Sequence, residues 1–297
     1  MQITSLKITD YRIITTILCI ILSRFFSETT VHFTAALGVL TVGILHGSND
    51  LSLVKKLGFL QYKGQRFLFY IAFVLLCVIF LYRTPAFSLF VFILISAYHF
   101  GEQQWGNTIS LPRIHMYLFY FLYGLFLFTF LFYVHSMEVS VIINQISQIP
   151  IKSIPDFKVF ALSSFLALFV YTLLLAKHIK SSLIHIFIET PLLLFLFWST
   201  DLFTGFAIYF VFWHSWPSML EQIQTLYGSK RFVFKYLLDA WPYWLMSILG
   251  LTLLYFYIED LSLDPLSLFF AFLASITFPH VLVIFALNRL FKPNTNA

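Results

Sequence analysis

Four histidines lie within or at the end of segments apolar enough to cross a membrane, and they are the residues best suited to chemistry. They are His46, His99, His214 and His280. A neutral imidazole offers a nitrogen lone pair to a transition metal, and an ionisable side chain at membrane depth is a functional candidate by default. Several such histidines held at one depth would therefore predict a metal site.

Carboxylates follow two of these histidines closely along the chain. Asp50 comes four residues after His46, and Glu102 comes three residues after His99. Such carboxylates can accept the second N–H of a metal-bound imidazole and so fix its tautomer. The alternative is that both are solvated charges at the ends of helices.

Glycine or proline residues lie next to each of the four histidines or close to it. Gly47 and Gly101 directly follow two of the histidines, where a small residue permits a close approach of backbone or ligand and can end a helix. Pro217 follows His214 and Pro279 precedes His280, which predicts local departures from regular helix. Such departures are tolerated at membrane depth where they line protein or a cavity.

A further carboxylate, Glu189, lies inside an apolar segment, four residues after His185. Because a carboxylate within a membrane segment is a functional candidate, we expect Glu102 and Glu189 to be the catalytic or proton-handling groups. The alternative for Glu189 is a purely structural pairing with His185.

The histidine spacing excludes two classes of metalloenzyme. The paired HxxxH and HxxHH boxes of membrane di-iron enzymes are absent, and no HExxH zinc motif occurs. The pattern instead predicts a mononuclear site built from histidines of separate helices. Imidazole ligands suit iron, copper or zinc.

The composition indicates an integral membrane protein. Hydrophobic residues make up 60% of the 297 residues, charged residues only 10%, and the mean hydropathy is +0.88. A soluble domain carries about 25% charged residues. We expect one membrane domain over residues 1–297, without a nucleic-acid partner, because the positive charge follows from the placement of basic loops.

Ten apolar segments predict an all-α fold, a polytopic transmembrane bundle of about ten helices. They cover roughly residues 13–27, 31–47, 67–82, 86–101, 116–134, 158–176, 183–199, 202–217, 241–258 and 265–288. The polar stretch 135–157 is amphipathic and rich in isoleucine. We expect it to lie flat on the membrane interface.

The basic residues predict the orientation. With both termini inside (N-in, C-in), all but four of the 18 Lys and Arg residues fall on the cytoplasmic side of a plasma membrane. In that arrangement the segments that carry the four histidines all run inward. The histidines then share one depth, in the cytoplasmic leaflet.

The sequence stretches around the four histidines resemble those of a known family. The four relevant stretches are His46-Gly47-Ser48-Asn49-Asp50, His99-Phe100-Gly101-Glu102-Gln103-Gln104-Trp105, Trp213-His214-Ser215 and Pro279-His280. In order and in polytopic pattern, the chain resembles the Brp/Blh family of bacterial and archaeal membrane β-carotene 15,15'-dioxygenases. The resemblance implies cleavage of the central double bond of β-carotene by O2 at Fe(2+), giving two molecules of all-trans retinal. Retinal of this origin typically supplies a microbial rhodopsin.

The resemblance also assigns residues. His46, His99 and His214 match the presumed iron ligands of the family. Many members have a second histidine four residues after the one matching His214, where this chain has Ser218. We expect His280 to supply the fourth nitrogen, while Ser218 stays near the metal site. The alternatives are three protein ligands with an additional open position, or a member with altered activity.

A hydrocarbon substrate confined to the lipid bilayer needs an apolar tunnel with lateral entry. The aromatic residues that we expect to line it lie near the histidines, namely Tyr98, Phe100, Trp105, Phe210, Trp213 and Trp216. Aromatic residues are also common against lipid and at membrane interfaces. Most of the 38 Phe, 16 Tyr and 6 Trp residues are therefore expected to serve packing.

Three other functions remain open from the sequence. The chain could be a related oxygenase that acts on another carotenoid. It could be a b-haem electron-transfer protein, in which paired histidines bind haem. It could also be a transporter, but the sequence has no inverted repeat of the kind such folds contain.

Overall fold

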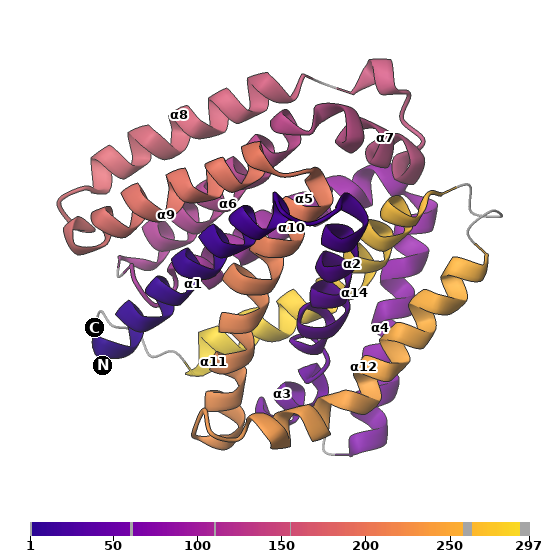
Figure 1. Cartoon of the computed structure of the whole chain (residues 1–297). Coiled ribbons are helices and arrows are strands. Elements are labelled where there is room, and N and C mark those ends of the chain that lie inside the picture. The colour runs from indigo at the N-terminus through magenta and orange to yellow at the C-terminus, as the bar shows by residue number, and fades with distance from the viewer. Residues whose placement is uncertain (1, 60–61, 110, 155, 258–262, 292–297) are drawn as a thin grey trace.

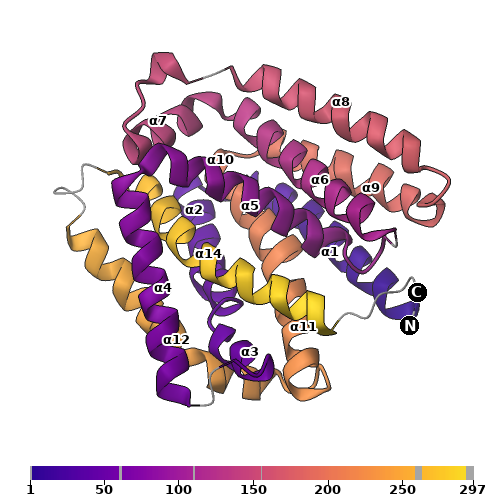
Figure 2. The same ribbon diagram turned by 180° about the vertical axis from the view of Figure 1, so that it is seen from behind.

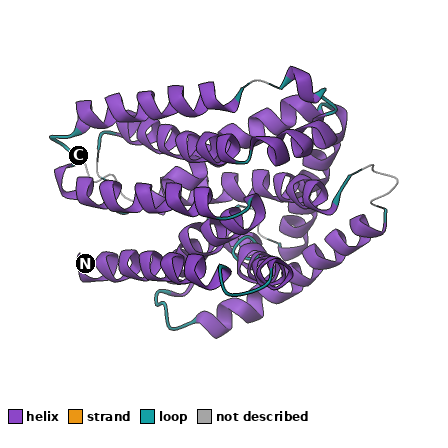
Figure 3. Ribbon diagram, turned by 45° about the horizontal axis from the view of Figure 1, so that its top comes forward, coloured by secondary structure: helices purple, strands orange, loops and turns teal. Residues whose placement is uncertain are grey.

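The computed structural model describes residues 2–59, 62–109, 111–154, 156–257 and 263–291. Within these ranges the chain is helical and contains no strand (Figure 3). The predicted all-α fold is confirmed. Helices satisfy their backbone hydrogen bonds internally, which an apolar chain in lipid requires.

Seven helices of the described part are long and apolar enough to span a membrane (Figure 1). They are α4 (Lys63–Arg83), α5 (Pro85–Trp105), α6 (Arg113–Val134), α8 (Phe157–Leu175), α9 (Lys180–Ser199), α12 (Val233–Phe256) and α14 (Pro265–Phe291). Each corresponds to one of the apolar segments predicted from the sequence.

The remaining three predicted segments fold into shorter or interrupted helices. α1 (Gln2–Ser23) is apolar only from Tyr11 onward. The segment 31–47 contains α2 (Glu28–Gly38) followed by a π-helix, η1 (Val39–Gly43). The segment 202–217 contains α10 (Leu202–Ile208), a second π-helix, η3 (Tyr209–Ser215), and the start of α11 (Trp216–Tyr227).

Short elements complete the fold: α3 (Asp50–Lys56), α7 (Ser136–Ser147) and the 3-10 turn η2 (Ile151–Ser153). α7 packs on α5 and α14, with Val139, Ile142 and Ile146 buried. The apolar face of α7 thus turns into the protein. That this stretch lies along the membrane interface stays a prediction.

α5 and α6 pack closely because each presents a glycine to the other. A Cβ on Gly101 would lie 1.9 Å from the carbonyl oxygen of Tyr120, and a Cβ on Gly124 would lie 1.8 Å from that of Ala97. Gly101 therefore does not end its helix, as its position suggested. It lets the backbone of α6 approach α5, which continues to Trp105.

The two prolines differ in their effect. Pro217 lies in the first turn of α11, directly after η3, so the chain does depart from α-helix just before it. Pro279 lies inside α14, which continues through it as α-helix, so the predicted departure at Pro279 is wrong. Neighbouring helices can stabilise a proline within a membrane helix.

α1 begins and α14 ends at the same end of the bundle, as views from both sides show (Figures 1 and 2). The ten crossings predicted from the sequence would likewise place both ends on one side. The direction of the bundle in the membrane stays a prediction from the basic residues.

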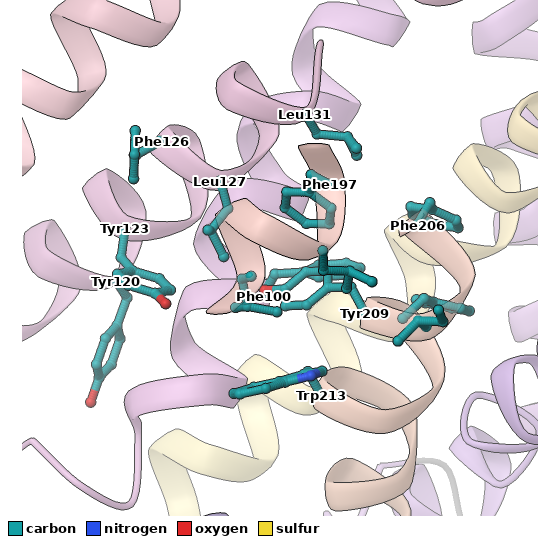
Figure 4. Packing of buried hydrophobic residues seen from close by; sticks show 14 of the residues in the cluster. Phe100, Tyr120, Tyr123, Phe126, Leu127, Leu131, Phe197, Phe206, Tyr209 and Trp213 are labelled. Atoms are coloured by element: carbon teal, nitrogen blue, oxygen red, sulfur yellow. The ribbon is translucent and has the colours of Figure 1, made fainter. Parts of the chain in front are cut away.

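An aromatic core lies where α5, α9 and η3 meet (Figure 4). Phe100 lies against Tyr209, with ring centres 5.6 Å apart, and Tyr209 packs edge-on against Phe197 at 5.8 Å. These contacts fix η3 against α5 and thus fix the two histidine-bearing elements relative to each other.

Candidate metal centre

The four histidines singled out from the sequence come together in the structure. His46 lies in the turn after η1, His99 on α5, His214 in η3 and His280 on α14, and all four are buried. His46 packs against His214 and His280, with ring centres 5.1 and 4.8 Å apart. His99 packs against the same two rings at 4.8 and 5.4 Å. The four rings therefore alternate around a common centre.

This spacing fits four imidazoles around one ion. Bonds from a metal to imidazole nitrogen are about 2.1 Å long, which places ring centres about 3 Å from the ion and about 5 Å from one another. Within the described residues no three His, Cys, Asp or Glu side chains are already closed into a group that could hold a metal. The rings must turn their free nitrogens inward to complete a coordination sphere.

Each ring has a buried nitrogen without a hydrogen-bond partner among the described residues. These atoms are Nε2 of His46, both nitrogens of His99, Nδ1 of His214 and Nε2 of His280. Burying a polar atom without a partner costs free energy, so such atoms are rare in folded proteins. A bound cation would satisfy all four rings at once.

The opposite nitrogens of two rings are held by hydrogen bonds. Nδ1 of His46 donates to the carbonyl oxygen of Gly43, and Nδ1 of His280 lies 2.9 Å from Oδ1 of Asp50. The hydroxyl of Tyr70 donates to the other carboxylate oxygen of Asp50 at 2.7 Å. With Nδ1 as the donor, Nε2 of both rings carries the lone pair that a metal needs.

The role expected for Asp50 therefore changes. Its closeness to His46 in sequence suggested that it orients His46, but the carboxylate pairs with His280, 230 residues further along the chain. No pattern in the sequence indicated this pair or the contribution of Tyr70.

The two π-helices place His46 and His214. π-helical turns are rare and frequent at functional sites. η1 packs against η3, and a Cβ on Gly43 would lie 2.7 Å from the ring of Phe210. Glycine at position 43 thus permits the close contact that brings His46 beside His214.

Aromatic rings restrict the orientation of His214. Its ring stacks on Phe100, with centres 4.0 Å apart and planes at 13°, and lies nearly parallel to Phe210 at 5.5 Å. Flat contacts of this kind limit rotation of the imidazole about its side-chain bonds.

The histidines line an apolar cavity of about 310 Å³. Of the six aromatic residues expected to line a tunnel, Phe100 and Phe210 do so. The other four lie elsewhere. Tyr98 donates a hydrogen bond to Glu102, and Trp213 donates one to Thr16. Trp105 packs on Tyr123, and Trp216 packs on the cluster that contains Met219.

Most of the lining was not predicted. It comes from α4, α6, α7, α10 and α12 and from the apolar faces of α5 and α14. It includes Phe67, Ile71, Val74, Phe92, Ile142, Ile146, Met246, Leu273 and Ile276. These residues are aliphatic or Phe, like most of the chain, so composition could not distinguish them.

The two expected catalytic glutamates do not line the cavity. Glu102 accepts a hydrogen bond from Tyr98 at 3.1 Å, and neither ring nitrogen of His99 bonds to it within the described residues. Glu189 pairs with Arg12, Gln104 and His185. The geometry thus favours the structural alternative for Glu189.

Ser218 is connected to His46 through a series of hydrogen bonds. Gln222 donates to its hydroxyl at 3.2 Å, and the hydroxyl of Tyr236 donates to Gln222 at 2.9 Å. The Tyr236 hydroxyl also lies 3.2 Å from the carbonyl oxygen of His46, which accepts a hydrogen bond from it. The chain Ser218–Gln222–Tyr236 therefore supports the turn that carries His46.

Comparison with known proteins gives one family. A family model described as "Beta-carotene 15,15'-dioxygenase" matches residues 37–288, a range that contains all four histidines. No curated protein and no solved structure matches the chain significantly.

Proposed function

Because this chain belongs to the beta-carotene 15,15'-dioxygenase family, we propose that it cleaves the central 15,15' double bond of β-carotene with O2. One oxygen atom of O2 goes to each half, giving two molecules of all-trans retinal. The observation that carries the proposal is the group of four buried imidazoles, each with an unpaired nitrogen, at the wall of an apolar cavity.

The residues that would hold Fe(2+) are His46, His99, His214 and His280. Bound iron supplies the redox chemistry that splitting a carbon–carbon double bond with O2 requires. Four neutral ligands leave the charge of the ion uncompensated and can leave coordination positions open. In this proposal His280 supplies the fourth nitrogen ligand, because this chain has Ser218 where many family members have a histidine.

The surrounding residues bind and orient. Asp50 and Tyr70 hold the His280 ring with Nε2 free, and the Gly43 carbonyl does the same for His46. The apolar lining excludes water and holds the polyene by dispersion contacts, as apolar ligand pockets generally do. No acid or base is needed for the overall reaction, which agrees with the absence of Glu102 and Glu189 from the cavity lining.

The membrane helices fit this substrate. β-Carotene resides in the lipid bilayer, and the helices of this chain are apolar enough to lie there. We place the enzyme in the cell's inner (plasma) membrane as a multi-pass protein. Its product would supply a retinal-binding rhodopsin.

Expression of the full chain in bacteria that accumulate β-carotene tests the proposal. We expect the cells to lose their orange colour and to accumulate retinal, identified by chromatography and mass. The double variant His99→Ala/His214→Ala, produced at the same level, should keep the colour. The purified protein should contain iron without a Soret absorption band. Unchanged β-carotene in cells that make the folded protein, or a Soret band, would reject the proposal.

A further inference from the structure

One wall of the cavity follows a single face of α5. The lining residues Leu89, Phe92, Ser96 and His99 recur every three or four positions, as one face of a helix requires. At a rise of about 1.5 Å per residue, the ten steps from Leu89 to His99 span about 15 Å.

α14 gives the same length independently. Phe270, Leu273, Thr277 and His280 line the cavity at the same helical spacing and also end at a histidine. From residue 270 to residue 280 the helix rises about 15 Å. We call the space between these two stripes, Leu89–His99 and Phe270–His280, the α5 arm.

α7 closes the far end of the α5 arm. Val139, Ile142 and Ile146 line the cavity and are 4%, 8% and 8% exposed. α7 packs on both α5 and α14, so this end is covered by a helix that is held in place.

α4 and α12 also line the cavity. Its lining includes Ile71 and Val74 on α4 and Met246 and Gly250 on α12. Of the candidate membrane spans in the described part of the chain, these two helices have the smallest buried shares, 11% for α4 and 6% for α12. α4 and α12 are therefore the most exposed of the candidate spans that line the cavity, and in a bilayer this side would face lipid.

The length of the α5 arm matches half of a carotenoid. An extended chain advances about 1.2 Å per bond, so a half with its terminal ring measures about 15 Å. We propose that one half of the substrate occupies the α5 arm until its ring meets α7, and that this depth determines which double bond lies at the histidines. This inference rests on the proposed function and adds the residues that set the cleavage position.

Substitutions on α7 test the inference. Ile142→Trp and Ile146→Trp should shorten the α5 arm by a few ångströms. Successive double bonds of the polyene are about 2.4 Å apart, so this shortening corresponds to one or two of them. We expect these variants to cleave one or two double bonds away from the centre. The products would then be two carbonyl compounds of unequal length whose carbon atoms sum to those of β-carotene: a methyl ketone and an aldehyde after a shift of one double bond, and two aldehydes after a shift of two.

Val141→Trp is the matched control, because Val141 lies on the same helix but is 38% exposed. This variant should give retinal alone, as the wild-type chain should. If either arm variant does not fold, Ile142→Ala/Ile146→Ala replaces it, since a deeper arm should also give unequal products.

The outcomes separate the two proposals. Retinal as the sole product of folded Ile142→Trp, Ile146→Trp and the double alanine variant would overturn the role of α7 and leave the enzyme function intact. Failure of the wild-type chain to cleave β-carotene would instead overturn the function itself. Unequal products from the arm variants, with retinal alone from Val141→Trp, support the inference.

Discussion

Two buried polar regions of this chain differ in one respect that separates function from structure. The histidine group contains ring nitrogens without hydrogen-bond partners. In the region around Glu189, by contrast, both carboxylate oxygens have a partner. Both lie within the helical bundle, and both draw residues from several helices. Burial and polarity alone would have marked both as functional.

The Glu189 region connects α1, α5, α6, α9 and η3. Its carboxylate accepts a hydrogen bond from Gln104 at 3.1 Å and lies 3.7 Å from the guanidinium of Arg12 and 3.8 Å from His185. Gln104 also contacts the hydroxyls of Tyr123 and Tyr209, at 3.0 and 3.4 Å. The carboxylate of Glu189 therefore has its partners within the protein. Nε of Arg12 is buried without a partner among the described residues, but it is a donor and cannot bind a metal ion.

Several unpaired acceptor nitrogens around one centre are therefore a better indicator of a metal site than burial and polarity. Buried polar groups in folded proteins are nearly always hydrogen-bonded. Four imidazoles with free nitrogens therefore call for a ligand that supplies what the protein does not. Substitutions in the two regions should therefore differ in their effect on β-carotene cleavage.

The largest effect is expected from His99→Ala, because both nitrogens of His99 are unpaired. Loss of residues that only orient a metal ligand costs about 10–100-fold, so loss of a ligand should lower retinal formation by more than about 100-fold. Retinal yield per folded protein and iron content would both be measured. Wild-type yield from this variant, with full iron, would show that His99 is not a ligand.

Asp50→Asn should have an intermediate effect. The variant weakens the bond that holds Nδ1 of His280, so iron affinity should fall about 10–100-fold, and added iron should restore cleavage. Tyr70→Phe, which removes only the hydrogen bond on the far carboxylate oxygen, should have a smaller effect in the same direction. Equal iron affinity in all three proteins would show that Asp50 does not act on the metal site.

Glu189→Ala should leave cleavage by the folded protein nearly unchanged. Removing one partner of a buried ion pair destabilises a protein by about 3–5 kcal/mol, so the thermal midpoint should fall. In the double variant Arg12→Met/Glu189→Met, which leaves no buried charge unpaired, much of the stability should return. If folded Glu189→Ala loses its iron, the two regions are not separate, and Glu189 belongs to the functional site.

The sequence predicted the convergence of the histidines because their depth follows from two simple properties. Apolar length locates the segments, and the distribution of Lys and Arg orders them across the membrane. His46, His99, His214 and His280 could thus be placed at one level without knowledge of how the helices pack.

Rotation of the helices about their axes was harder to predict. Tyr98 and Phe100 are both aromatic and stand on either side of His99, but only Phe100 lines the cavity. A helix that is apolar on all faces has no polar side to fix its rotation. For the same reason the sequence did not reveal the contact of Asp50 with His280 or the lining supplied by α7.

The π-helix η3, which carries His214, makes the number of residues in this segment matter as much as their identity. Successive residues of an α-helix are offset by about 100° around its axis, and a π-helical turn accommodates one residue more than an α-helical turn. Deleting a single residue from Tyr209–Val211 would restore ordinary helix and rotate the imidazole away from its three neighbours. An insertion would do the same in the opposite sense, so this segment should tolerate substitutions far better than changes in length.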